Sequence, residues 1–373
     1  MSNDSGLKKL EFKIKGAFNA LFKVFFRKGR AGVCPLDGNK LSRVLFLRPD
    51  RLGDTICSLP LIDAVRKHYP HVKIGIFASP KNISLIKNDP RFDYVFIYHR
   101  NIIKDIRDVQ KVRSTDFDCV VDLMGDDSTT ALCLSQLCTR NKARIGVWKR
   151  RFATYYDYNY PYNPDCADHI IDINMKLCEP LGINSDEITG FSPPYIEPLA
   201  FDKADGYINS LPGKEGELSI GLNLSVRLSN RIWGFEKSRD LITSILSKCS
   251  YCRIILITAP NDRYRGDELI KEFDNRVYQV PSGCSITEAS AIISRLDLMI
   301  SADTSLVHIA RSFKVPVVGL YPKFSGVYRQ WRPYDQEGGL VLSKGGDDIF
   351  NITPAMVLES FMDMLEKQKS AVK

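Results

Sequence analysis

The chain has 373 residues, 44% of them hydrophobic, and a formal net charge of +8 at pH 7. This length exceeds what one hydrophobic core usually organises, so two domains are expected. The first thirty residues carry +6 of the charge, and the +2 left for the other residues does not indicate nucleic acid as a partner.

The N-terminal segment, residues 7–28, has the pattern of a basic amphipathic helix. One helical face is apolar and most lysines lie on the others; the apolar face holds Leu7, Leu10, Ile14, Phe18, Leu21 and Phe25. Such a helix is typical of segments that lie on anionic lipid headgroups. The alternative is a helix docked on the first domain, or a frayed extension. We therefore expect an arm over residues 1–40 that binds the membrane surface.

Residues 41–190 alternate between strand and helix patterns, as a doubly wound parallel sheet does. The predicted strands are residues 43–47, 72–77, 94–98, 119–123 and 143–146. In the loop after the first strand, Gly53 lets the backbone pass close to a ligand, and Asp54 lies at the start of the next helix. This domain is expected to hold one binding surface.

Residues 191–217 are rich in Pro and Gly and are expected to link this domain to a second one. The second domain, residues 218–373, repeats the alternation. Its predicted strands are residues 218–223, 253–257, 277–279, 298–301 and 317–320, and its last helix is residues 354–367. The predicted fold class is α/β, with two Rossmann-like doubly wound lobes and a cleft between them.

Residues 296–320 gather unusual polar side chains at the end of a buried strand. Asp303 ends the strand, and Thr304 is expected to cap the helix that follows. His308 lies one helical turn after Thr304, so it shares a face with Thr304 and lies near Ser305. A helix start with free N–H groups suits a phosphate. The alternative is an ordinary capped helix with a half-buried histidine.

Two segments, LRPDRLGDTICSLPLIDAVRKHYP and ISADTSLVHIARSFKVPVVGLYP, resemble glycosyltransferase family 9, the bacterial heptosyltransferases that build the lipopolysaccharide inner core. The resemblance runs from about Leu41 to the last helix. It implies the glycosyltransferase B architecture, with the last helix crossing back to the first lobe. It also implies inverting transfer of heptose from ADP-heptose, with the nucleotide sugar as co-substrate and without metal or another cofactor.

The resemblance further implies roles for individual residues. Asp54 would be the general base, and Arg231, two residues before Trp233, would hold the donor diphosphate. The other donor-binding residues would be Asn223, Ser225, Asp262, Asp303, Thr304, Ser305 and His308. The acceptor, with its acidic Kdo and phosphate groups, would contact Arg51, Gly53, Arg144, Lys149 and Arg150. Without the family, Asp54 reads as a carboxylate that serves only the helix dipole, and the basic residues read as a solvated loop.

The implied partners are a nucleotide-sugar donor, a lipid-linked saccharide acceptor and the cytoplasmic membrane surface. The expected location is the cytoplasm, peripherally on the inner face of that membrane. Ten scattered cysteines fit a reducing compartment, and the one C-x-x-C motif, Cys249 and Cys252, has no second pair with which to bind zinc. No membrane span or signal peptide is readable. Four alternatives remain open: a family member that uses another nucleotide sugar, a nucleotide-sugar epimerase of the same architecture, a nicotinamide-dependent dehydrogenase, which lacks support because no G-x-G occurs, and a non-catalytic lipid-binding module.

Overall fold

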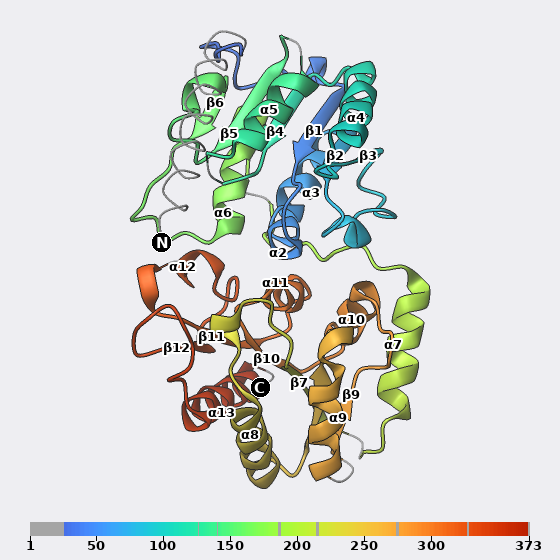
Figure 1. Ribbon diagram of the computed structural model, residues 1–373, viewed down its shortest axis with the longest axis vertical. Coiled ribbons are helices and arrows are strands. Elements are labelled where there is room, and N and C mark those ends of the chain that lie inside the picture. The colour runs from blue at the N-terminus through green and yellow to red at the C-terminus, as the bar shows by residue number, and fades with distance from the viewer. Residues whose placement is uncertain are drawn as a thin grey trace, which may run out of the picture.

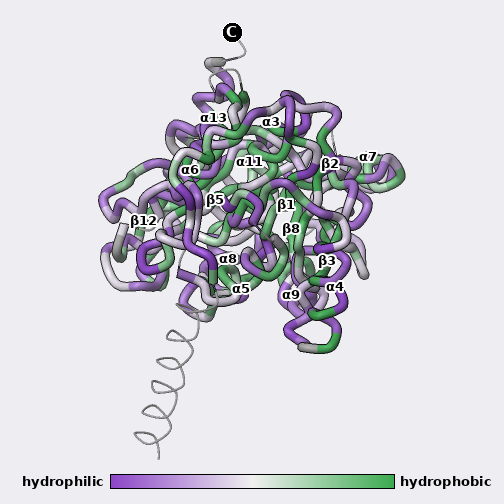
Figure 2. Tube along the Cα trace, turned by 90° about the horizontal axis from the view of Figure 1, so that it is seen from above, coloured by the Kyte–Doolittle hydropathy of each residue, from purple (hydrophilic) through white to green (hydrophobic). Residues whose placement is uncertain are grey.

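The structure is a computed structural model that describes residues 26–371 apart from residues 126, 140, 186–187, 214–215, 274–275 and 327. The described residues form two α/β lobes, one above the other in Figure 1, each built on its own sheet. Seen from above, many hydrophobic residues lie towards the middle of the molecule and many hydrophilic ones along its rim (Figure 2). The predicted amphipathic segment, residues 7–28, lies outside the described residues except for its C-terminal end.

The first lobe holds a parallel sheet that has six strands within the described residues, in the order β3-β2-β1-β4-β5-β6. Its strands are β1 (Arg43–Leu47), β2 (Lys73–Ala78), β3 (Tyr94–Ile97), β4 (Cys119–Asp122), β5 (Ala143–Val147) and β6 (Tyr158–Tyr160). Its α-helices are α2 (Leu52–Ile56), α3 (Leu59–His68), α4 (Ile102–Thr115), α5 (Thr129–Cys138) and α6 (Ile170–Met175). Short 3-10 helices are η1 (Gly38–Lys40), η2 (Ile83–Leu85), η3 (Ala153–Tyr155) and η4 (Lys176–Leu181). The central strands β1 and β4 are apolar on both faces and buried, as strands with helices on both sides of the sheet are.

The second lobe repeats this plan, with a sheet of six strands within the described residues in the order β12-β11-β10-β7-β8-β9. Its strands are β7 (Leu218–Asn223), β8 (Cys252–Ile257), β9 (Val277–Gln279), β10 (Leu298–Ala302), β11 (Val317–Tyr321) and β12 (Leu340–Leu342). Its α-helices are α8 (Phe235–Lys248), α9 (Arg263–Glu272), α10 (Ile286–Ile293), α11 (Ser305–Ser312), α12 (Tyr328–Trp331) and α13 (Pro354–Ala371). Its 3-10 helices are η5 (Ser229–Arg231), η6 (Pro260–Asp262) and η7 (Phe324–Gly326).

Both sheets have the same strand order when strands are counted from the first of each lobe. The direction of winding reverses between β1 and β4 and again between β7 and β10, which pair in parallel. In open parallel sheets, ligands bind beyond the carboxyl ends of the strands at such a reversal. The segments that carry Asp54 and Asp303 follow β1 and β10 and therefore begin at these two places.

The predicted fold class is confirmed. Each of the ten predicted strands is present, with ends that differ by no more than one residue from the prediction. The prediction missed the edge strands β6 and β12. Each has three residues, too few for an apolar period to be recognised.

The predicted linker contains a helix, α7 (Pro198–Ser210), that packs on the second lobe. Tyr207 Oη donates a hydrogen bond to the Gln279 carbonyl at 2.9 Å, and Lys203 Nζ lies 2.7 Å from Glu288 Oε1. The extended residues 191–197 precede this helix. The part of the connection without regular secondary structure is therefore shorter than the sequence suggested.

The last helix, α13, does not follow the expected course back to the first lobe. It packs on α8 and against β11 and β12 (Figure 1). Val357, Phe361 and Leu365 form a stripe at four-residue spacing and are buried in the core of the second lobe. Gln368 Nε2 donates to the Asp297 carbonyl at 2.9 Å, which fixes the far end of the helix to the same lobe. An amphipathic helix needs an apolar surface to cover, and here the second lobe supplies it.

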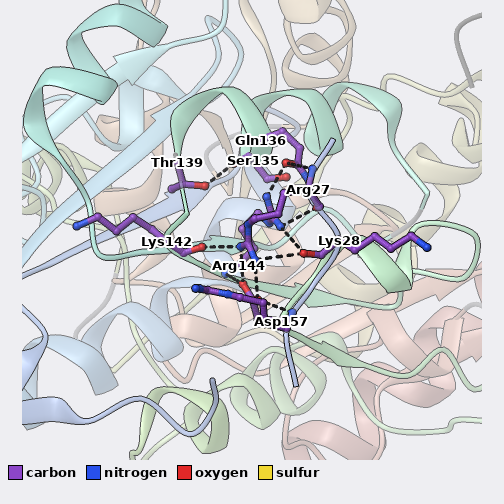
Figure 3. Close-up of polar contacts among 9 residues, drawn as sticks. Arg27, Lys28, Ser135, Gln136, Thr139, Lys142, Arg144 and Asp157 are labelled. Carbon is purple, nitrogen blue, oxygen red and sulfur yellow. Dashed lines mark hydrogen bonds and ion pairs between the residues drawn. The ribbon is translucent and has the colours of Figure 1, made fainter. Parts of the chain in front are cut away.

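The first described residues are fastened to the outer end of the first lobe (Figure 3). Asp157 accepts hydrogen bonds from Arg27 Nη2 at 3.0 Å and from the backbone N–H of Arg30 at 2.8 Å. It also accepts one from the backbone N–H of Arg144 at 2.8 Å, and Arg144 Nη2 donates to the Arg27 carbonyl at 2.9 Å. Asp157 directly precedes β6, and Arg144 is the second residue of β5. The cluster therefore lies at the amino ends of these strands.

Two general expectations can be compared with the structure. All ten cysteines are free, and several are fully buried, as expected of reduced core residues. Across the described part of residues 26–371, no helix combines the length and the apolar character that spanning a bilayer requires.

Candidate active site

The two lobes meet where α2 of the first packs on α11 of the second (Figure 1). A Cβ atom on Gly53 would lie 3.2 Å from His308 Cδ2 and 3.5 Å from Ser305 Cα. A side chain at position 53 would therefore push the two helices apart. The structure thus brings together residues from the two segments that the sequence singled out, which are separated by about 250 positions in the chain.

The loop between β1 and α2 is held by Arg48, whose side chain is buried beneath it. Nε donates to the Asp54 carbonyl at 3.0 Å and to Ser58 Oγ at 2.8 Å. Nη1 donates to Asp50 Oδ2 at 3.1 Å and to the Leu123 carbonyl beyond β4. These bonds fix the position of Asp54 relative to the sheet.

Replacing Arg48 by Lys should lower the free energy of unfolding by about 2 kcal/mol. A single ammonium group keeps the charge but cannot reach the same set of acceptors as the planar guanidinium, so buried acceptors lose their partner. Urea unfolding at equilibrium measures the change. Arg43→Lys at the start of β1, the strand that Arg48 follows, is the control, because within the described residues the Arg43 side chain forms no hydrogen bond or ion pair. A loss no larger than that of the control would contradict the role of Arg48.

Two carboxylates lie near each other in this loop, Asp50 and Asp54. Burial and the negative charge of Asp54 raise the pKa of Asp50 to about 6, against the attraction of Arg48. Asp50 Oδ1 is buried and has no hydrogen-bond partner among the described residues. A pKa near the operating pH suits a general base, so Asp50 is a second candidate that the sequence did not single out. Asp50 is bound to Arg48, whereas Asp54 lies beside the residue that contacts the second lobe.

In the second lobe, Arg231 lies at the end of η5, near the carboxyl end of β10. Its Nε is 3.6 Å from Asp303 Oδ2, and its Nη atoms contact Asp347 in the loop after β12. Burial raises the pKa of Asp303, while the positive charges of Arg231 and Arg51 oppose that shift. Arg51 belongs to the first lobe and was predicted to bind the acceptor. Because its charge acts on Asp303, both lobes contribute charge to this junction.

Thr304 occupies the N-cap position of α11, but within the described residues its side chain makes no capping hydrogen bond. Its Oγ1 accepts from Asn223 Nδ2 at 3.2 Å and lies 3.2 Å from Ser301 Oγ. Asn223 Nδ2 also donates to Ser301 Oγ at 3.0 Å. Thr304 is thus the N-cap residue, as predicted, but its hydroxyl joins a cluster that ties the ends of β7 and β10 together instead of bonding to the helix N–H groups. The N–H groups at the start of α11 have no side-chain cap from this residue.

His308 is buried against the first lobe, near Asp54 and His169. Burial lowers the pKa of His308 to about 4, although the charge of Asp54 opposes this. Its ring centre lies 6.0 Å from that of His169, which caps α6 and whose Nε2–H donates to the Arg332 carbonyl at 2.9 Å. His308 Nδ1 has no hydrogen-bond partner in the described part of the chain. His308 is therefore neutral at pH 7 and offers a hydrogen bond, not a positive charge.

The remaining donor-side residues lie along the carboxyl ends of β7 and β8. Ser225 Oγ accepts from the Ala259 N–H at 2.7 Å, and the Asp262 carboxylate lies 3.9 Å from Arg265 Nε. A pocket opens beside them at the ends of β7 and β10. Its lining is mainly apolar and includes Leu222, Asn223, Leu224, Trp233, Phe235, Arg265 and Ser301. Such a lining suits the flat ring of a nucleobase.

Lys149 and Arg150 follow β5 at the same edge of the first sheet, but their environments differ. Lys149 is buried, and its Nζ lies 3.0 Å from Asp122 Oδ2. Arg150 is exposed, and its guanidinium carbon lies 4.8 Å from the centre of the Tyr162 ring. Arg150 is therefore available to an anionic ligand, whereas Lys149 already neutralises a buried carboxylate.

The assignment of Arg144 to the acceptor site needs correction. Its side chain is fully buried, and Nη1 and Nη2 donate to Gln136 Oε1 at 2.5 Å and to the Arg27 carbonyl at 2.9 Å (Figure 3). Arg144 is near the amino end of β5, and the lobes meet at the carboxyl ends of the strands. Because Arg144 lies at the amino end of its strand, it stabilises the first lobe and does not face the junction between the lobes.

Two further polar residues escaped the sequence analysis because their partners are distant in the chain. Asn82 is buried and donates to the Arg48 carbonyl at 2.7 Å and to Thr55 Oγ1 at 2.8 Å. Asp347 binds Arg231, more than one hundred positions earlier. The polar loop GGDD was the one available signal for Asp347, and such loops are common.

The described residues contain no cluster of three or more His, Cys, Asp or Glu side chains arranged to hold a metal ion. The expectation that transfer needs neither metal nor another cofactor stays a prediction.

Comparisons with known proteins find similarity to heptosyltransferases. A sequence model described as glycosyltransferase family 9 (heptosyltransferase) matches residues 106–348, more than half of the chain. Lipopolysaccharide heptosyltransferase 3 of Escherichia coli K12 is 24% identical over 301 residues, which cover 76% of this chain and 83% of that protein.

Solved structures share the fold. A glycosyl transferase family 9 structure from Veillonella parvula DSM 2008 aligns with a TM-score of 0.72 at 16% identity, covering 87% of this chain and 97% of that one. The Escherichia coli heptosyltransferase WaaC with ADP aligns with a TM-score of 0.64 at 17% identity, covering 87% of this chain and 98% of that one.

Proposed function

Because this chain belongs to glycosyltransferase family 9, we propose that it transfers heptose from ADP-heptose to the inner core of lipopolysaccharide with inversion at the anomeric carbon. Family membership makes it a glycosyltransferase and removes the epimerase, the dehydrogenase and the non-catalytic module from consideration. The donor is taken from relatives of this fold, one of which is a heptosyltransferase with ADP. The acceptor class is taken from the lipopolysaccharide heptosyltransferase of Escherichia coli.

The observation that carries the proposal is the meeting of Asp54 with the start of α11 at the lobe junction. Gly53, the residue before Asp54, packs against Ser305 and His308 of the second lobe, the charge of Asp54 acts on His308, and Arg231 with Asp303 lies at the adjacent strand end. Glycosyl transfer needs a base for the acceptor hydroxyl and positive groups for the departing diphosphate. Residues of both kinds lie where the two sheets face each other.

The proposed reaction assigns each residue one task. Asp54 takes the proton of the acceptor hydroxyl, whose oxygen attacks the anomeric carbon as the bond to the diphosphate breaks. The nucleoside diphosphate leaves from the opposite face, which inverts the configuration. Arg231 and the N–H groups at the start of α11 stabilise the charge that develops on the leaving group. His308, which is neutral, donates or accepts a hydrogen bond.

A donor panel tests this proposal. The purified protein is incubated with a deacylated inner-core acceptor and, separately, with ADP-heptose, UDP-sugars and GDP-sugars. Turnover with ADP-heptose alone, a product heavier by one heptose, and inverted anomeric configuration by nuclear magnetic resonance are expected. Turnover with a different nucleotide sugar would keep the family and change the donor. A product with retained configuration would contradict the role given to Asp54.

We further propose that residues 1–25 hold the protein on the cytoplasmic leaflet, where a lipid-linked acceptor is presented. The support is the basic amphipathic pattern, because each basic residue near an anionic surface contributes about 1 kcal/mol. Deleting residues 1–25 leaves Arg27 and Arg30 on Asp157, so the first lobe keeps its fastening. The deletion removes a net charge of +3, so the truncated chain should bind phosphatidylglycerol vesicles about 100-fold more weakly in sedimentation assays. Its turnover of a water-soluble acceptor should stay within about twofold of the full chain, since the role proposed for the arm is to bind the membrane and not to take part in the reaction.

Two results would contradict the proposed role of the arm. The truncated chain could sediment with vesicles as the full chain does, or its melting temperature could fall, which would mark the arm as part of the first lobe. Raising the salt concentration with the full chain is the second measurement. It should weaken vesicle binding, because the electrostatic part of the attraction is screened over about 8 Å at physiological ionic strength.

A further inference from the structure

The proposed diphosphate-binding residue, Arg231, is already occupied by a carboxylate of its own chain. Nη1 donates to the Asp347 carbonyl at 2.7 Å and Nη2 to Asp347 Oδ1 at 3.2 Å. The neighbouring Asn230 also points its amide at Asp347, with Nδ2 2.7 Å from the carbonyl and 3.2 Å from Oδ2. Asp347 thus accepts hydrogen bonds from the side chains of both Asn230 and Arg231.

Asp347 lies outside Arg231 and covers it. The Arg231 side chain is 11% exposed, whereas that of Asp347 is 58% exposed. The third nitrogen of the guanidinium, Nε, is buried, faces Asp303 Oδ2 at 3.6 Å and makes no hydrogen bond in the described part of the chain. A phosphate that binds a guanidinium through two parallel hydrogen bonds needs two of these nitrogens. Asp347 occupies the edge formed by Nη1 and Nη2, and Asp303 faces the edge that includes Nε, so the Nη1–Nη2 edge becomes available when Asp347 leaves.

We propose that Asp347 is an internal substitute for the donor diphosphate, which it must yield to when a nucleoside diphosphate binds. This inference rests on the proposed function, because it takes Arg231 as the diphosphate ligand. Without donor, the Asp347 carboxylate and carbonyl satisfy Asn230 and Arg231. With donor, phosphate oxygens replace them, and Asp347 turns towards solvent.

The loop that carries Asp347 lies between two fixed ends. At one end, the Ser343 N–H donates to the Tyr321 carbonyl at 2.9 Å and Ser343 Oγ accepts from the Lys323 N–H at 3.1 Å. At the other, Ile349 is fully buried in the core of the second lobe. Residues 344–348 lie between these ends and include Gly345 and Gly346, the latter with a φ of +79°. Glycines at this point let the backbone change direction without displacing the ends.

Competition from Asp347 lowers the apparent affinity for every ligand of this site, because binding needs the state in which Asp347 is displaced. Ligands that bring strong negative charge recover the loss by taking over both hydrogen bonds. A nucleoside or a neutral sugar cannot, so the loop favours a diphosphate over ligands that share only its base or sugar.

The test compares two charge-neutralising variants in the same loop, Asp347→Asn and Asp348→Asn. Asp348 is half-buried, and its Oδ1 accepts from the Phe350 N–H at 2.9 Å instead of contacting Arg231. Both variants remove one negative charge near the site, so their difference isolates the contact with Arg231. Calorimetric titration with ADP, and with inorganic pyrophosphate as the probe without a base, gives the dissociation constants. Asp347→Asn should tighten ADP binding about tenfold and Asp348→Asn less than about twofold.

Two further measurements sharpen the result. In an Arg231→Ala background, Asp347→Asn should no longer tighten ADP binding, because the competing contact is gone. In the unmodified chain, ADP should accelerate hydrogen exchange of amides in residues 344–350, among them that of Lys344, which donates to Asn351 Oδ1 at 2.9 Å.

The outcomes separate this inference from the proposed function. Equal or weaker ADP binding by Asp347→Asn, with ADP bound by the unmodified chain, overturns the substitute role alone and marks Asp347 as a support for Arg231. Tightening that persists in the Arg231→Ala background also overturns it. If neither the unmodified chain nor Asp347→Asn binds ADP or pyrophosphate, both the inference and the proposed donor fail.

Discussion

Replacing Asp54 by Asn should lower the turnover number by about 100- to 10,000-fold, the usual worth of a positioned general base. The amide has the same shape but cannot take the proton of the acceptor hydroxyl. The fold should persist, because Arg48 and Ser58 bind the backbone carbonyl of residue 54 and not its side chain. Affinity for ADP should change little, since the residues proposed to bind the diphosphate belong to the second lobe. Steady-state kinetics and titration of ADP on the same preparation measure both quantities.

The variant Asp50→Asn shows which of the two carboxylates, Asp50 or Asp54, is the general base. Asp50 has its pKa raised to about 6 by burial and by Asp54, so it is the rival for the role of base. If Asp54→Asn turns over at the normal rate and Asp50→Asn does not, the assignment is reversed. Because Asp50 is also bound to Arg48, a melting curve must accompany its kinetics.

Replacing Arg231 by Ala should lower kcat/KM by about 100- to 1,000-fold, which is the usual cost of removing one group that stabilises developing negative charge. Binding of ADP should weaken in parallel, because a diphosphate is charged in the ground state and gains charge as it leaves. The loss also leaves Asp303 and Asp347 without the cation between them. Thermal unfolding of the variant shows whether that repulsion disturbs the fold.

Arg231→Lys is the matched variant for this prediction. It keeps the charge and loses the second parallel hydrogen bond, so its kcat/KM should fall by about tenfold only. Unchanged affinity for ADP in Arg231→Ala would show that Arg231 does not hold the diphosphate, whatever happens to turnover.

The alternation of apolar strands and amphipathic helices predicted both sheets, because a central parallel strand buries both faces and leaves a long apolar run. β6 and β12 were missed, since an edge strand of three residues buries little. The course of α13 could not be predicted either. Its stripe of Val357, Phe361 and Leu365 shows that one face is buried, but the pattern is the same whichever lobe supplies the partner.

The sequence predicted those parts of the site whose position follows from the order of strands and helices along the chain. Residues that directly follow β1 and β10 must lie at the carboxyl edges of their sheets, and Asp54, Asp303 and Ser305 do. What the sequence could not supply is contact between distant segments. Arg48 reaches a carbonyl 75 positions away, and Arg231 reaches Asp347 across 116 positions. Neither partner shows a pattern of its own.

Since α13 stays with the second lobe, the described chain passes from one lobe to the other only once, through residues 190–197. Each half could therefore be produced as a separate polypeptide that contains every strand of its own sheet. The two halves would still contact each other through the packing of α2 on α11. They would also keep the hydrogen bond that Tyr334 Oη donates to Asp172 Oδ1 at 2.9 Å across the junction. A break near residue 193 would turn a single-chain transferase into a complex of two polypeptides, whose activity would report the reassembly of its halves.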